Sequence, residues 1–172
     1  LWTDCNRTIH AAEAYAIHER DMQERPEDFA ALTRNRILPG AFVPASKYIQ
    51  AQQLRAALCR EFAQAMRGLD AVITLSSLLL PCRIDDPVAI AKTYDQQCRL
   101  VFNVTGGPAI SVPTGLSQSG LPLAMQIASR AFAEPMVFRI AQAYCEAAGT
   151  CIGAEPTTQP RILAASRTAA AE

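Results

Sequence analysis

The chain has 172 residues, of which 50% are hydrophobic and 19% charged, and its 16 basic and 16 acidic residues give a net charge of zero. This length and composition are typical of one packed domain rather than a disordered segment. The charge is balanced and no run of Lys and Arg is interleaved with aromatic residues, which argues against nucleic acid as a direct partner.

The six cysteines are spread along the chain: Cys5, Cys59, Cys82, Cys98, Cys145 and Cys151. They form no Cys-x-x-Cys pair, and with only two histidines no zinc-binding spacing can be assembled. Disulfides persist mainly in oxidising compartments. We therefore expect free thiols in a cytoplasmic protein that holds no metal and no cofactor.

The N-terminus does not resemble a signal peptide, and no apolar run reaches the roughly 18 residues that a membrane-spanning helix needs. We therefore expect no membrane partner. The first residue is Leu1 rather than Met, so we expect a processed chain, a trimmed chain or a fragment.

Helices are predicted for most of the chain before residue 70. Thr8 is a favoured cap for a helix over residues 9–18, which are rich in alanine. Pro26 suits the first turn of a second helix, and Pro39 with Gly40 ends it.

The longest predicted helix covers about residues 47–67, with Ser46 as its N-cap and Gly68 at its C-terminal end. Apolar residues recur along it every four positions: Leu54, Leu58, Phe62 and Met66. This spacing places them on one face, so we expect that face to pack against a core.

Short strands are predicted over residues 70–75, 109–113 and 121–128, and the last two form a hairpin across a polar turn at residues 117–120. Residues 121–128 are apolar on both faces, and such a strand is normally covered on both sides. So few strands make a poor sheet in isolation. We therefore expect residues outside this chain to complete the sheet, and the open hairpin strand to associate with another chain.

Helices also separate and follow these strands. The Asp-Pro pair at residues 86–87 starts a helix that breaks and resumes over residues 94–102, and residues 134–149 form a final helix that ends in glycine. The periodicity is lost after residue 153. We expect one domain over residues 1–153 and a flexible tail over residues 154–172.

A longer motif surrounds the hairpin. Residues 103–115 read Asn-Val-Thr-Gly-Gly-Pro-Ala-Ile-Ser-Val-Pro-Thr-Gly, and residues 120–126 read Gly-Leu-Pro-Leu-Ala-Met-Gln. This pair of segments resembles the late part of amidase-signature enzymes, which usually show N-x-x-G-x-P-A-x-S-x-P-x-G, a short turn, and then G-L-P-x-G-x-Q. That family includes bacterial amidases and the A subunit of the amidotransferase that converts glutamyl-tRNA to glutaminyl-tRNA.

Other segments resemble the same family in the same order. Residues 13–18 are similar to its acidic, aromatic, His-containing helix, residues 48–55 to its Y-x-x-A-x-x-x-R helix, and residues 70–73 to the strand that follows. Two departures occur, Leu-Ser at residues 75–76 where the family has Pro-Thr, and Ala124 where it has a second Gly. Either can change the local backbone, since alanine tolerates positive φ poorly, but neither removes a known catalytic group.

The resemblance extends over about residues 8–150 and implies an α/β fold. The chain is then expected to be the C-terminal part of an amidase-signature α/β/α sandwich, in which helices flank a mixed sheet. The family cleaves an amide carbon–nitrogen bond through an acyl-serine, using a Ser nucleophile, a second Ser and a Lys. A neutral Lys can relay the proton through the second hydroxyl, and a Gly-Ser-rich loop supplies N–H groups for the oxyanion.

The chain lacks this Ser–Ser–Lys set, so we expect no catalytic residue in it. The Ser-Ser pair at residues 76–77 is followed by three leucines and no glycine. Lys47 and Lys92 are expected at the surface. His10 and His18 are eight residues apart, about two helical turns, and no Ser or Cys nucleophile motif accompanies them.

Candidate substrate-binding residues lie in or near the matching segments: Arg55, Asn103, Thr105, Gly106, Gly107 and Gln126. Polar residues beside a glycine turn can line a pocket, or Asn103 can end a helix while the glycines only form the turn. Arg55 pairs either with a substrate carboxylate or with a surface acid. Gln126, if buried, needs a partner, which is either the backbone of the core or the substrate.

Two functions remain open. The first is a C-terminal segment of an amide hydrolase that is catalytically incomplete alone and acts on a small amide after the missing N-terminal part of the domain joins it. The alternative is a non-catalytic binding or assembly module that retains the amidase scaffold. A homo-oligomer is another way to cover the open sheet. A Gly-Ser-rich loop encoded upstream, with a Lys some tens of residues before it, would favour the enzyme.

Overall fold

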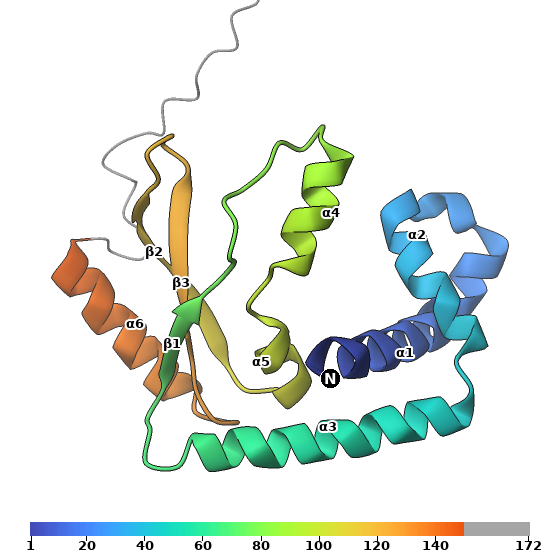
Figure 1. Cartoon of the computed structure of the whole chain (residues 1–172), viewed down its shortest axis with the longest axis horizontal. Coiled ribbons are helices and arrows are strands. Elements are labelled where there is room, and N and C mark those ends of the chain that lie inside the picture. The colour runs from blue at the N-terminus through green and yellow to red at the C-terminus, as the bar shows by residue number, and fades with distance from the viewer. Residues whose placement is uncertain (150–172) are drawn as a thin grey trace, which may run out of the picture.

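Residues 1–149, apart from the side chain of residue 95, are described by the computed structural model shown in Figure 1. The α-helices are α1 (Trp2–Glu24), α2 (Ala31–Ile37), α3 (Ala45–Ala65), α4 (Pro87–Asp95), α5 (Leu100–Thr105) and α6 (Glu134–Ala148). The 3-10 helices are η1 (Pro26–Asp28) and η2 (Leu38–Phe42), and the strands are β1 (Val72–Leu75), β2 (Ala109–Leu116) and β3 (Pro122–Ala128). The predicted tail over residues 154–172 and the domain end at residue 153 lie outside the described residues.

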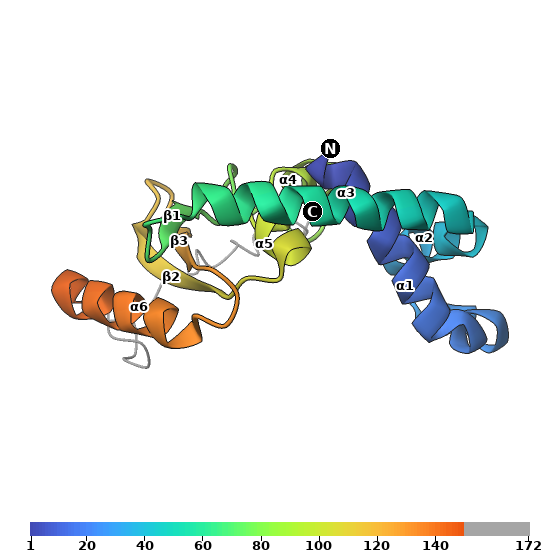
Figure 2. The same ribbon diagram turned by 90° about the horizontal axis from the view of Figure 1, so that it is seen from below.

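Helix α3 connects two regions of the molecule. The sheet and α6 lie at one end of α3, whereas α1 and α2 lie at the other end (Figures 1 and 2). The expected α/β fold is therefore confirmed. None of the helices described is both long enough and apolar enough to cross a membrane.

Helix α1 begins at Trp2, so the prediction that Thr8 caps this helix is wrong. The added first turn is held by tertiary packing: Cys5 is buried against Leu58 of α3 and Val104 of α5, and Trp2 packs against the same cluster. Burial of apolar side chains is a larger contribution than one capping hydrogen bond. The capping preference of Thr8 alone therefore does not predict where the helix begins.

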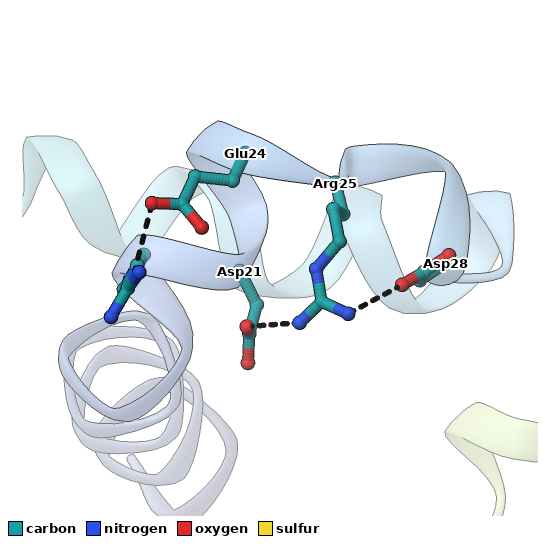
Figure 3. Close-up of polar contacts among 5 residues, drawn as sticks. Asp21, Glu24, Arg25 and Asp28 are labelled. Atoms are coloured by element: carbon teal, nitrogen blue, oxygen red, sulfur yellow. Dashed lines mark hydrogen bonds and ion pairs between the residues drawn. The ribbon is translucent and has the colours of Figure 1, made fainter.

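Arg25 links the end of α1 to η1, as Figure 3 shows. Its Nη2 atom lies 2.7 Å from Asp21 Oδ1, and its Nη1 atom lies 3.4 Å from Asp28 Oδ2. The hydrogen bond that Arg25 donates to Asp21, and then the negative charges of both carboxylates, raise the pKa of Arg25 above its usual value. These side chains are largely exposed, so the ion pairs contribute little to stability.

The second predicted helix is split in two. Pro26 starts only the short η1, and α2 begins at Ala31. After α2, Gly40 in η2 approaches α1 so closely that a Cβ atom there would collide with the carbonyl group of Ala11. Only glycine allows this packing of η2 on α1, which explains why the helix stops near the predicted position.

Helix α3 follows Pro44, and Ser46 lies inside its first turn, so the prediction of Ser46 as N-cap is wrong. The predicted apolar stripe is confirmed, because Leu58 and Met66 are buried and Leu54 and Phe62 are half-buried. Just beyond the helix, Gly68 adopts the left-handed conformation with φ of 77°.

The three strands form one antiparallel sheet in the order β1-β3-β2. The predicted hairpin is confirmed, and β2 extends to Leu116 through an irregularity between Pro113 and Gly115. Helix α6 covers one face, where Val112, Ile127 and Cys145 form a buried core. This helix begins at Glu134, and Gly149 ends it in the left-handed conformation, both as predicted.

Strand β3 is the central strand, so the expectation of an open edge on β3 is wrong. Its residues Ile127 and Ala128 are fully buried. The edge strands are instead β1 and β2, and on β1 Ile73 and Leu75 face the same side as Ile127 but are 61% and 56% exposed. Helix α6 packs on β2 and β3, so the apolar face of the sheet is wider than the helix that covers it.

The segment between β1 and β2 contains a helix break as predicted, but Tyr94 still belongs to α4 and the second helix begins at Leu100 rather than at residue 94. Asp86 caps α4 by accepting a hydrogen bond of 2.9 Å from the backbone N–H of Ala89, as predicted. The chain then loops before α5, where the backbone N–H of Leu78 donates to the carbonyl of Gln96. Helix α5 continues to Thr105, beyond the predicted end at residue 102, and leads directly into β2.

Candidate functional site

The candidate residues are distributed around the end of α5 and do not form one cluster. Arg55 and Asn103 line a first cavity of about 870 Å³. Thr105 and Gly107 line a second cavity of about 460 Å³. Gly106 and Gln126 are among the lining residues of neither cavity.

Arg55 connects α3 to α5 through a hydrogen bond. Its Nε atom donates a hydrogen bond of 2.7 Å to the carbonyl oxygen of Val104. The last carbonyls of a helix lack partners within the helix and favour a nearby positive charge. Arg55 forms no ion pair with any acidic side chain that the structure describes, so the surface salt bridge considered from the sequence is not found among these side chains.

The two glycines of the motif are required by the backbone. Gly106 has φ of 72° and ends α5 by donating its N–H to the carbonyl of Phe102 at 2.8 Å. A Cβ atom at Gly107 would lie 2.5 Å from the carbonyl oxygen of Ser129. Gly107 therefore permits the close approach between the start of the hairpin and the residue after β3.

Thr105 has a buried hydroxyl at the second cavity. Its Oγ1 atom has no hydrogen-bond partner among the described residues. The wall beside it combines apolar side chains such as Phe62 and Met66 with Arg130. Buried hydroxyl groups are normally paired, so this one is unusual.

Gln126 lies inside the sheet, with only 5% of the residue exposed. Its Nε2 atom donates to Thr74 Oγ1 at 2.9 Å and to the carbonyl of Leu75 at 3.3 Å. The amide therefore ties β3 to β1 across the face opposite α6.

The first cavity contains residues that the sequence did not point to. Arg36 of α2 stacks on the ring of Tyr94 in α4, with Cζ 3.6 Å from the ring centroid, and Arg99 lies 5.8 Å from the same centroid. Arg7 also lines this cavity. The only sequence signal was the helix break, which Tyr94 and Arg99 flank. Arg36 had no such sequence signal, because its partner Tyr94 lies far from it along the chain.

The serine pair considered from the sequence is not part of a catalytic set in the described chain. Ser76 Oγ lies 3.1 Å from Ser111 Oγ, while Ser77 Oγ accepts from the backbone N–H of Leu79. Lys47 and Lys92 are exposed, as predicted. Neither lysine hydrogen-bonds to a serine among residues 1–149.

The histidines and cysteines also form no reactive centre in the part that the structure describes. His18 packs edge-on against Phe29, with ring centroids 5.5 Å apart. No group of three or more His, Cys, Asp or Glu side chains within residues 1–149 is placed to hold a metal. The five described cysteines are free thiols, and burial raises the pKa of Cys5. Cys151 lies outside the described residues.

Comparison with known proteins identifies the family. The family model named Amidase matches residues 3–138. The A subunit of glutamyl-tRNA(Gln) amidotransferase from Granulibacter bethesdensis is 38% identical over 141 residues, which cover 77% of this chain and 27% of that protein. The corresponding subunit from Brevibacillus brevis is 34% identical over 151 residues, covering 82% of this chain and 30% of that protein.

The fold agrees with this relationship. A crystal structure described as an amidase superposes with a TM-score of 0.73 at 23% identity, covering 85% of this chain and 35% of that one. The chain thus spans under a third of the two curated relatives, at 27% and 30% of their lengths. From the family match and the shared fold, this chain belongs to the amidase family.

Proposed function

We propose that this chain is the C-terminal segment of an amide C–N bond hydrolase and is catalytically incomplete by itself. In the complete enzyme, a serine attacks the amide carbonyl, the C–N bond breaks and the amine leaves, and water then hydrolyses the acyl-serine to release the carboxylic acid. Family membership supports the reaction class. The chain covers only 27% and 30% of the lengths of the two curated relatives, which supports the view that the nucleophile lies in a part of the enzyme outside this chain.

One observation carries this proposal: the Ser76–Ser111 hydroxyl pair has no basic partner. The two oxygens are 3.1 Å apart, but no lysine hydrogen-bonds to either among the described residues. A serine hydroxyl is a weak nucleophile until a base takes its proton. A glycine-rich loop that could offer N–H groups to an oxyanion is also missing around Ser76.

In this proposal the segment contributes one wall of the substrate site. Arg55 and Asn103 line the first cavity and Thr105 lines the second, so their side chains are the proposed substrate contacts. Gly106 and Gly107 form the turn that joins α5 to β2 and so position these side chains. Gln126 would act indirectly, by holding β3 and β1 together, because its amide nitrogen already donates hydrogen bonds to Thr74 and Leu75.

The proposed partner is the missing N-terminal part of the same domain, and β1 is where it would join. An unpaired strand edge accepts another strand, and Ile73 and Leu75 leave an apolar surface beside that edge. A second copy of the chain is the alternative occupant. We also propose a cytoplasmic location, since the described cysteines are all free thiols.

The test is to express the chain with and without the sequence encoded directly upstream. The isolated chain should not hydrolyse a panel of aliphatic and aryl amides, whereas the extended protein should, provided that the upstream sequence contains a Gly-Ser-rich loop and a preceding Lys. Hydrolysis by the isolated chain that Ser76→Ala abolishes would contradict the proposal. An upstream sequence without such a loop would favour the binding or assembly module.

A further inference from the structure

We draw no further inference here: the strongest candidate, the second cavity beside the buried Thr105 hydroxyl that has no hydrogen-bond partner among the described residues, belongs to the substrate site that the proposed function already assigns to this segment.

Discussion

The Nε atom of Arg55 donates a hydrogen bond of 2.7 Å to the carbonyl oxygen of Val104, and this contact joins the middle of α3 to the last turn of α5. Val104 is buried in the cluster that also holds Cys5 and Leu58. The turn at Gly106 follows directly, so the start of the hairpin is positioned through this bond.

Arg55→Ala should therefore destabilise the chain by about 1–2 kcal/mol, the contribution of a half-buried hydrogen bond to a charged group. Chemical denaturation followed by circular dichroism measures this change. Arg60→Ala, one turn further along α3 and exposed, should change stability by no more than about 0.5 kcal/mol. Equal losses in the two variants would show that the bond to Val104 contributes nothing specific.

Gly107→Ala should cost about 1–3 kcal/mol, because a Cβ atom placed 2.5 Å from the Ser129 carbonyl oxygen forces the backbone apart. Gly120→Ala in the exposed β2–β3 turn is the control. Its φ of 79° is strained for alanine, but its surroundings are open, so it should cost only about 1 kcal/mol. Thermal denaturation compares the two variants, and a loss at Gly107 no larger than at Gly120 would contradict the steric argument.

The bond between Gln126 and Thr74 should stabilise the pairing of β3 with β1. Gln126→Leu and Thr74→Val each remove one partner, and each should cost about 1–3 kcal/mol because the remaining polar group loses its hydrogen bond. In a double-mutant cycle, the combined variant should lose less than the sum of the two single losses. Simple additivity would mean that the two side chains do not interact.

The exposed apolar residues of β1 should cause the isolated chain to associate. Ile73→Ser should lower both the sedimentation coefficient at high concentration and the binding of a hydrophobic dye, because it interrupts the apolar surface beside an open strand edge. Ile84→Ser is the control, since Ile84 is 95% exposed but lies outside the sheet. A chain that is monomeric before any substitution would refute the idea.

Much of the secondary structure was predictable from short segments. The Asp86 cap, the glycine that ends α6 and the hairpin between β2 and β3 all follow local rules, because each depends on residues within a few positions along the chain. The resemblance of residues 103–126 to amidase-signature enzymes likewise needed only the order of residue types. These features were confirmed since no distant contact overrides them.

Other features were decided by the tertiary structure. Helix α1 starts before Thr8 because Cys5 packs against α3 and α5, and β3 became the central strand because β1 pairs with its free edge. The stacking of Arg36 on Tyr94 joins residues from α2 and α4, which no local pattern relates. The sequence by itself determined that most helices and turns form, and it determined the family. The sheet order and the arginine-lined cavity depend on side chains that are distant along the chain. No local pattern could predict them, because burial and charge act through space and not along the chain.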